Sequence, residues 1–261
     1  MDEITELGMS FNIMIGKIRQ MLESKVKEQE NLKKAELKAL QAQINPHFLY
    51  NTLDTIVWMA QANKTEQVID IVQALSNFFR IALSKGKDWI TIDQEIEHVR
   101  SYLTIQKLRY HDILDYTIEV DEDIRSGTIL KLTLQPLVEN ALYHGIKNKR
   151  GPGTITVRAQ KAGDGGEAAD GEVRLEISDD GVGFTPYKLG RIKASLENET
   201  EDYSFSENGF GLANVHQRIQ LYYGKQYGLA VQSRYQEGTR VTVTIPLLVS
   251  ADPLVLEEQA I

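Results

Sequence analysis

The chain contains no cysteine. This absence excludes disulfide bonds, thiolate catalysis and zinc–thiolate sites, and it agrees with a reducing cytosol. The sequence also lacks any run of roughly 18–20 apolar residues, the length that a helix needs to span a bilayer. Its opening residues, MDEITELGMS, have neither the basic nor the apolar region of a signal peptide. Taken as given, the sequence therefore predicts a soluble chain.

Acidic side chains outnumber basic ones: the sequence has 37 Asp and Glu and 29 Lys and Arg, which gives a formal net charge of -8. No basic block is dense enough to neutralise a run of phosphates, so we expect no nucleic-acid partner. An acidic ligand must instead be held by local groups. Apolar residues make up 42% and charged residues 25% of the 261 residues, which indicates a folded chain long enough for two domains.

The first part of the chain, residues 4–59, is predicted to be almost continuous helix. Apolar residues spaced three and four apart predict a coiled-coil seam, and they are Leu7, Phe11, Met14, Ile18 and Met21. The pair Asn45-Pro46 interrupts this helix just before His47, because proline removes a backbone donor and crowds the preceding turn. We expect a kink at that point.

Two further helices are predicted at residues 65–83 and 93–110, the latter with Asp93 as its N-cap. The short turn around Asn63 would join the first long helix and the second into an antiparallel hairpin. The second helix carries an apolar stripe that comprises Val68, Ile71, Val72, Leu75, Phe78 and Phe79. Pairing with a second copy into a four-helix bundle would bury this stripe, so we expect a homodimer.

The periodicity changes from Tyr116 onward. Apolar and polar residues alternate, with many β-branched side chains, in five segments: residues 116–120, 154–160, 173–179, 229–234 and 239–246. Helical patterns at 132–146 and 212–222 lie between them, which predicts an α+β fold with one sheet and helices packed on it. The segment 162–171 is expected to be a hairpin connection and 185–208 a functional lid.

Four motifs in this second part occur in the order VENALYHG (138–145), SDDGVGF (178–184), NGFGLANV (208–215) and EGTRVTV (237–243). Together they resemble the GHKL (Bergerat) ATP-binding fold of histidine kinases, an α/β sandwich. The resemblance implies that Asn140 is a ligand of Mg²⁺, for which its neutral amide oxygen is suited. It also implies that Asp179 accepts a hydrogen bond from the amino group of the adenine of ATP.

The remaining nucleotide-binding residues follow from the same resemblance: His144, Lys147, Gly181, Gly183, Gly209, Gly211, Leu212 and Thr239. Gly181 and Gly183 would let a flat base approach the backbone. Glycines that lead into a helix leave amide groups free to hold phosphate oxygens. Thr239 would lie near the adenine, although a plain turn into a strand is an alternative for its motif.

The segment ALQAQINPHFLYNTLDTI (39–56) resembles the phosphoacceptor helix of LytS/YesM-like histidine kinases, with the signature Q-x-x-P/N-P-H-F-L-F/Y-N-x-L. The resemblance implies that His47 accepts the γ-phosphate of ATP, and a neutral imidazole is a good nucleophile near pH 7. Many histidine kinases place an acid directly after this histidine, but here the residue is Phe48. Glu139 is a candidate base. Asn51, one turn after His47, could orient water for phosphatase activity, or it could cap or pack.

Relatives commonly carry lysine at the position of Tyr143, so Lys147, Lys149 or Arg150 would have to supply that cation, or nucleotide binding is weakened. The opening residues also resemble the end of a HAMP relay helix, which implies the cytoplasmic portion of a cell-membrane receptor. We expect four segments: a HAMP-like end (1–22), a coiled-coil and phosphoacceptor dimerisation domain (23–112), a GHKL catalytic domain (113–248) and a tail (249–261).

The function that these resemblances imply is a two-component sensor histidine kinase. It would autophosphorylate His47 and pass the phosphoryl group to an aspartate of a response-regulator receiver domain. Two alternatives remain at this point. One is a non-catalytic scaffold that senses ATP and relays a signal, and the other is a GHKL ATPase that releases free phosphate.

Overall fold

The structure is a computed structural model, and it describes Lys17, Lys25 and residues 46–83, 88–162, 171–197 and 210–249. The chain divides into two compact units, Met1–Leu53 and Asp54–Ile261. The predicted HAMP-like end, the coiled-coil seam and the kink at Asn45-Pro46 lie outside the described residues. Within the described part, no helix combines the length and the apolar composition needed to cross a membrane.

Three helices form the region before the large sheet: α2 (Pro46–Gln61), α3 (Thr65–Ala82) and α4 (Ile92–Arg109). The turn between α2 and α3 contains Asn63 in the left-handed region, at φ 56°, a conformation that asparagine tolerates better than most residues. Helices α3 and α4 pack against each other, and the ring of Phe78 stacks on that of His98 with centroids 4.3 Å apart. The predicted bounds of α3 and α4 are confirmed to within one residue, and α2 ends two residues later than predicted.

The N-cap of α4 differs from the prediction. It is Thr91, which has extended backbone angles and accepts a hydrogen bond from Gln94 N at 3.2 Å, while Gln94 Oε1 accepts from Thr91 N at 3.1 Å. This reciprocal pair is a capping box. The predicted cap, Asp93, lies inside the first turn, and its carboxylate pairs with Arg125 at 2.7 Å. The prediction of Asp93 was therefore wrong by two positions.

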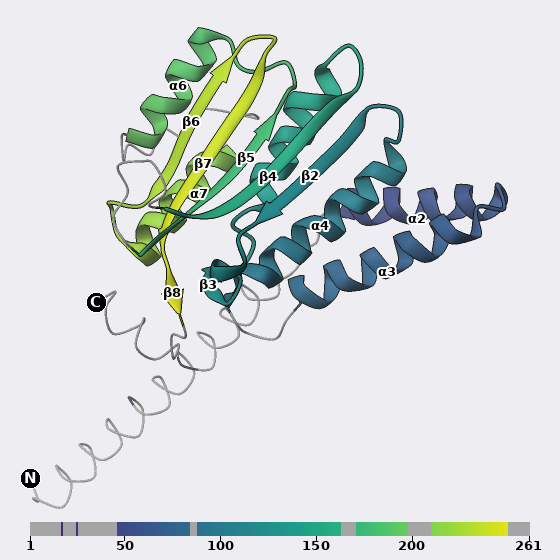
Figure 1. Cartoon of the computed structure of the whole chain (residues 1–261), viewed down its shortest axis with the longest axis horizontal. Coiled ribbons are helices and arrows are strands. Elements are labelled where there is room, and N and C mark those ends of the chain that lie inside the picture. Colours follow the sequence, from purple (N-terminus) through teal and green to yellow (C-terminus); the bar gives the residue numbers. More distant parts are fainter. Residues whose placement is uncertain are drawn as a thin grey trace, which may run out of the picture. The chain divides into compact units, whose positions relative to one another are not determined.

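The five predicted strand segments form one sheet with the order β2-β4-β5-β7-β6 (Figure 1). The strands are β2 (Leu114–Val120), β4 (Gly153–Ala162), β5 (Glu172–Asp179), β6 (Gly228–Arg234) and β7 (Gly238–Pro246). Strand β2 is parallel to β4, and the other neighbours are antiparallel. Because β4 and β5 pair as far as Ala162 and Glu172, the predicted hairpin at 162–171 is confirmed.

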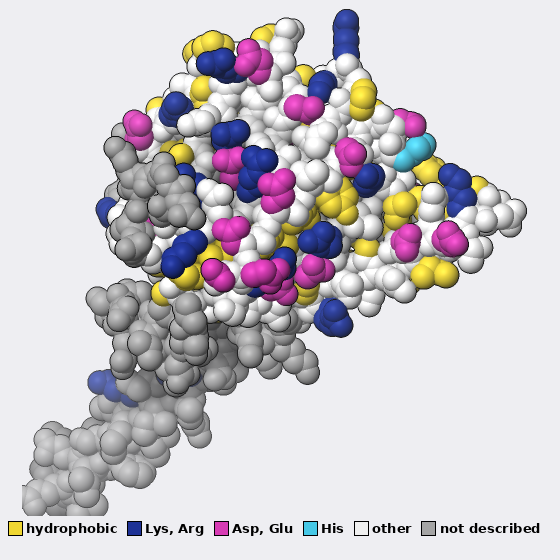
Figure 2. Space-filling model, in the orientation of Figure 1, with side chains coloured by type: hydrophobic (Ala, Val, Ile, Leu, Met, Phe, Trp, Pro, Cys, Tyr) yellow, Lys and Arg dark blue, Asp and Glu magenta, His cyan; other side chains and the backbone are white. Residues whose placement is uncertain are grey.

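The two faces of this sheet differ in chemistry. Helix α7 (Phe210–Tyr223) and the helical run that begins with α5 (Gln135–Asn140) lie behind the sheet in Figure 1. The apolar residues of β5 are buried. On the face seen in Figure 2, charges of both signs are mixed. Among the exposed ion pairs of the sheet, Arg158 Nε lies 2.7 Å from Glu119 Oε2. Exposed ion pairs of this kind stabilise a fold little, so the sheet is held by its apolar face.

Several elements were not predicted. A second, small sheet has the order β1-β3-β8, with strands β1 (Trp89–Thr91), β3 (Gly127–Leu130) and β8 (Leu248–Val249). These strands are too short for an alternating pattern to reveal them. The predicted lid, 185–208, begins with a helix, α6 (Pro186–Glu197), whose Ile192 is buried. The rest of that segment lies outside the described residues.

The helix predicted at 132–146 begins later than expected. Leu132 has φ 60°, which is incompatible with a helix, and α5 starts only at Gln135. The cause is Glu95, whose buried carboxylate accepts hydrogen bonds from Leu132 N at 2.9 Å and Leu134 N at 2.8 Å. After α5 the run continues as a π-helical turn (Ala141–Gly145) and a 3₁₀ turn (Ile146–Asn148). Such π turns often accompany functional sites.

The capping box at Thr91 gives a test of the fold. We expect Thr91→Ala to lower the free energy of unfolding by about 1 kcal/mol, because it leaves a helix amide without its acceptor. Thr65→Ala is the matched control: Thr65 also stands at a helix start, but its helix has no side-chain cap. Urea unfolding followed by circular dichroism measures both. An equal loss in the two variants would contradict the assignment of Thr91 as the cap.

Candidate functional site

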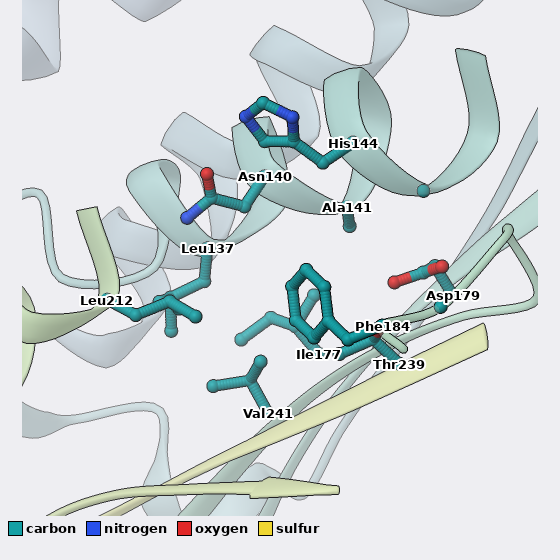
Figure 3. Close-up of a pocket in the computed structure, with 12 residues that line it drawn as sticks. Leu137, Asn140, Ala141, His144, Ile177, Asp179, Phe184, Leu212, Thr239 and Val241 are labelled. Atoms are coloured by element: carbon teal, nitrogen blue, oxygen red, sulfur yellow. The ribbon is translucent and has the colours of Figure 1, made fainter. Parts of the chain in front are cut away.

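A pocket lies between the α5 run, the end of β5, the first part of β7 and the start of α7 (Figure 3). All four sequence motifs contribute to its walls. The lining residues are Leu137, Asn140, Ala141, His144, Gly145, Ile177, Asp179, Gly183, Phe184, Leu212, Thr239 and Val241. The walls are thus mostly apolar with a few polar groups, which is the usual character of a small-molecule site.

Asp179 is the acidic group of this pocket. It ends β5, where it pairs with Ile155 of β4 on one side and Thr239 of β7 on the other. Its Oδ1 accepts a hydrogen bond from Gly181 N at 2.9 Å. Burial raises the pKa of Asp179 to about 6, although the amides of Gly181 and Thr239 favour the charged form. Near pH 7 the pocket therefore holds a carboxylate that can accept hydrogen bonds from a ligand.

The glycines around Asp179 are required by packing. A side chain at Gly145 would collide with the Asp179 carboxylate, and one at Gly181 would collide with the backbone of Gly145. Gly183 has φ 62°, and a Cβ there would meet the carbonyl of Arg234. The glycines of the D-x-G-x-G motif thus allow the strand end and the helical run to touch.

Ser233 is a residue that sequence reasoning missed. Its hydroxyl oxygen accepts from Phe184 N at 2.8 Å, and its single hydrogen goes to Gly238 O at 2.9 Å. Thr239 Oγ1 lies 3.0 Å from Ser233 Oγ, so the hydrogen of this bond must come from Thr239. The Thr239 oxygen consequently faces the pocket as an acceptor. Ser233 carries no motif signal, since a serine in an alternating strand is unremarkable in sequence.

Asn140 lies on the same helical face as Leu137, Ala141 and His144, with its amide near the start of α7 (Figure 3). A Cβ built at Gly211 would come within 3.1 Å of Asn140 Nδ2, so only glycine permits this approach without a shift. Gly211 and Leu212 belong to the first turn of α7, whose amides have no partner within the helix. Gly209 lies outside the described residues.

The residues that line the pocket include none of the three cations expected to replace a lysine at position 143, namely Lys147, Lys149 and Arg150. Lys147 donates to Tyr110 OH at 3.2 Å and stands 4.8 Å from the ring centroid of Tyr143, and it is not among the lining residues. Lys149 pairs with Asp180 at 3.1 Å. Neither contact involves Asn140. Arg150 is exposed.

Lys188 on α6 is a second residue that sequence reasoning missed. Its Nζ lies 5.0 Å from the centroid of the Phe184 ring, which lines the pocket. Burial lowers the pKa of Lys188, and burial together with the nearby Lys188 charge lowers the pKa of His144. His144 is therefore a neutral group at pH 7. Lys188 escaped notice because it stands outside the four motifs.

The remaining predicted residues lie elsewhere. Glu139 precedes Asn140 but does not line the pocket; its Oε1 accepts from Gln135 Nε2 at 2.9 Å, and burial raises the pKa of its carboxyl. His47 and Asn51 belong to the other unit, on α2, where His47 is exposed and Asn51 is half-buried. Thr52 Oγ1 donates to Phe48 O at 2.7 Å within that helix.

A magnesium ion would have to share its ligands with a nucleotide. No group of three or more acidic or histidine side chains suited to a metal occurs among the described residues. Mg²⁺ commonly binds through one or two protein oxygens, phosphate oxygens and water. The amide oxygen of Asn140, beside the first turn of α7, fits that role.

Comparison with known proteins agrees with this geometry. Residues 35–114 match the family model described as histidine kinase, and residues 126–249 match the model of histidine kinase-, DNA gyrase B- and HSP90-like ATPases. The chain belongs to the histidine kinase family. The second match implies that its pocket binds ATP, and the sheet with its helices is the GHKL-type ATPase fold that the sequence predicted.

Several curated members of the histidine kinase family are similar to the chain. Sensor histidine kinase YesM of Bacillus subtilis is 39% identical over 94% of the chain. Sensor histidine kinase YpdA of Escherichia coli is 34% identical over 83%, and sensor protein LytS of Staphylococcus saprophyticus is 32% identical over 82%. The chain spans 39%, 35% and 34% of the lengths of these relatives, respectively.

The pKa of Asp179 gives a test of the site. We expect an ionised Asp179 to accept an N–H of the adenine. Protonation would remove this acceptor, so ATP affinity should fall as the pH drops through about 6. The loss should approach tenfold per pH unit below that value. Equilibrium titration with ATP from pH 8 to pH 5 measures it. Asp179→Asn is the control, since it should bind weakly without this step. A wild-type affinity with the same pH dependence as the variant would contradict the role.

Proposed function

We propose that this chain is the catalytic core of a two-component sensor histidine kinase. In this proposal it transfers the γ-phosphoryl group of ATP to His47 and then to an aspartate of a response-regulator receiver domain. One observation carries the proposal: the chain contains both an exposed histidine in the phosphoacceptor motif and a pocket lined by Asp179 and Asn140. The histidine lies in the region that matches the histidine kinase model, and the pocket lies in the region that matches the ATPase model.

The nucleotide would be held by groups already in position. Asp179 and the oxygen of Thr239 accept hydrogen bonds from the adenine, and Ile177, Leu212 and Val241 offer apolar surface. The free amides in the first turn of α7 bind phosphate oxygens. Asn140 would be a ligand of Mg²⁺, which, when bound, neutralises charge on the phosphates and orients them. Lys188 supplies a cation near the pocket in place of the lysine missing at position 143.

The transfer step itself needs a neutral His47. Its imidazole nitrogen attacks the γ-phosphorus in line, a nitrogen–phosphorus bond forms, and the bond to the leaving oxygen of ADP breaks. The imidazole proton must leave, and Phe48 cannot accept it. Glu139 is the proposed acceptor, because its raised pKa makes it a stronger base than an exposed glutamate. Asn51 is proposed to orient water for hydrolysis of the phosphohistidine, a phosphatase reaction in which the nitrogen–phosphorus bond breaks and free phosphate leaves.

We also propose that the chain has the domain organisation predicted from the sequence. Residues 1–22 would be the end of a HAMP-like relay helix, residues 23–112 would form a coiled-coil and phosphoacceptor dimerisation domain, and residues 113–248 would form the catalytic domain. Together they would belong to the cytoplasmic part of a membrane receptor. Several large apolar side chains on α2 and α3 support pairing with a second copy, because they are exposed in the single chain: Tyr50, Leu53, Val57, Trp58, Ile69 and Val72.

The test is labelling with [γ-³²P]ATP in the presence of Mg²⁺. We expect acid-labile, base-stable label on the wild type, none on His47→Ala, and none on Asn140→Ala, because the latter loses the metal ligand. His111→Ala is the control, since His111 is an exposed histidine outside the pocket, and it should label normally. Label that survives in His47→Ala would contradict the proposal. Release of free phosphate without labelling of the wild type would favour the ATPase alternative.

A further inference from the structure

Ser233 and Thr239 face each other across the β6–β7 hairpin. They are register partners, and their hydroxyl oxygens lie 3.0 Å apart. On the other side of β7, Thr239 pairs with Asp179, and both of these residues line the pocket (Figure 3). Ser233 is not among the lining residues. The hairpin therefore connects a serine outside the pocket to the polar part of the pocket wall.

The three contacts of the Ser233 hydroxyl use all of its hydrogen-bonding capacity. A hydroxyl has one hydrogen and two lone pairs. The hydrogen goes to Gly238 O at 2.9 Å, because a carbonyl can only accept. One lone pair accepts from Phe184 N at 2.8 Å, because a backbone amide can only donate. The second lone pair faces Thr239, so the Thr239 hydroxyl must be the donor of that bond.

Thr239 consequently offers the pocket lone pairs and no hydrogen. The ionised carboxylate of Asp179, its neighbour on β5, also has only lone pairs to offer. Side chains of register partners lie on the same face of a sheet, so the two acceptors are adjacent. Two adjacent groups that can only accept hydrogen bonds favour a ligand edge that donates them.

The position of the hairpin does not depend on the Ser233 hydroxyl alone. Gln236 N, in the turn between β6 and β7, donates to Val182 O at 2.7 Å. Gly183 packs so closely on this hairpin that a Cβ there would collide with Arg234 O. Removal of the Ser233 hydroxyl should therefore free the Thr239 hydrogen while the strand stays in place.

The purine bases differ at position 6 in the property that this wall would read. Adenine carries an amino group there, with two N–H donors, whereas guanine and hypoxanthine carry a carbonyl oxygen, which only accepts, and a hydrogen on N1. Asp179 could accept that N1–H, so the carboxylate alone does not exclude a 6-oxopurine. The adjacent O6 would still need a donor, and Thr239 has no hydrogen left to give.

We propose that Ser233 is a specificity-determining positioning residue. By holding the Thr239 hydroxyl as an acceptor, it makes the pocket select a 6-aminopurine nucleotide over a 6-oxopurine nucleotide. Ser233 acts through Thr239 and does not itself contact the base. This inference rests on the proposed function, in which the base binds beside Asp179, and it adds the group that determines the direction of the Thr239 hydrogen.

The test compares ATP with inosine triphosphate (ITP), which has O6 and N1–H but, like ATP, no group at position 2. Titration calorimetry of the full chain with Mg²⁺ at pH 8, where Asp179 is ionised, measures both dissociation constants. We expect the wild type to bind ATP more tightly. Ser233→Ala should lower the ratio of the ITP constant to the ATP constant about tenfold, the effect of one hydrogen bond, because the freed Thr239 hydroxyl donates to O6.

Ser101→Ala is the matched control for Ser233→Ala. Ser101 is a buried serine of α4, and its hydroxyl also donates to a backbone carbonyl, Glu97 O, at 2.8 Å. It does not line the pocket. The variant loses a comparable hydrogen bond, so it should leave the ratio of the two constants unchanged.

Thr239→Val separates positioning from packing, because it keeps the shape of the side chain and removes the hydroxyl. In a chain that already carries Thr239→Val, Ser233→Ala should have no further effect on the ratio. An equal effect in both backgrounds would indicate packing and overturn the inference. If Ser233→Ala does not fold, Ser233→Cys takes its place and should lower the ratio, because sulfur is only a weak acceptor.

The binding data also separate this inference from the function on which it rests. A wild type that binds ATP and ITP equally would overturn the inference alone, as would a folded Ser233 variant with the wild-type ratio. A wild type that binds neither nucleotide would instead refute the proposed nucleotide site, and with it the kinase function.

Discussion

The pocket depends above all on the carboxylate of Asp179, a half-buried residue at the end of the central strand β5. Strands on both sides hold this residue in register, and the glycine positions around it leave the room that the carboxylate occupies. Its pKa is raised from the usual 3.8 to about 6, so the folded chain is less stable with Asp179 ionised. Protonated Asp179 therefore stabilises the folded chain. This stabilisation is complete below pH 3.8, the pKa in the unfolded chain, and is lost as the pH rises through about 6, the pKa in the folded chain. A binding role explains why the charge is kept.

Helix α4 organises the other wall of the pocket through buried polar side chains. Glu95 holds the amides of Leu132 and Leu134 and so determines where α5 begins. His98, one turn further along α4, reaches Gln135 in the first turn of α5. The helix that carries Asn140 is therefore positioned by groups of α4, which in turn packs on α3. A displacement of α4 would move both the start of α5 and the hydrogen bond to Glu139.

Much of this arrangement follows from local sequence patterns. The five strands of the large sheet alternate strongly, and the four motifs supplied the polar residues that meet in the pocket, among them Asn140, Asp179 and Thr239. What escaped prediction depends on contacts between distant segments. Helix α5 begins late because Glu95 binds the amide of Leu134. Ser233 contributes to the site because its hydroxyl accepts a hydrogen bond from Phe184 N, which is distant in the sequence. The strands of the small sheet are too short to carry a period, and Lys188 matters only because α6 folds beside the pocket.

We propose that a phosphoryl group from ATP is transferred to His47. The most direct measurement is peptide mapping by mass spectrometry at neutral pH after incubation with ATP and Mg²⁺, which keeps phosphohistidine intact. We expect one added phosphoryl mass on the peptide that contains His47, lost after brief acid treatment, and none on peptides with the other four histidines. A phosphoryl group on a different residue, or an unmodified His47 peptide under conditions in which ATP is consumed, would contradict it.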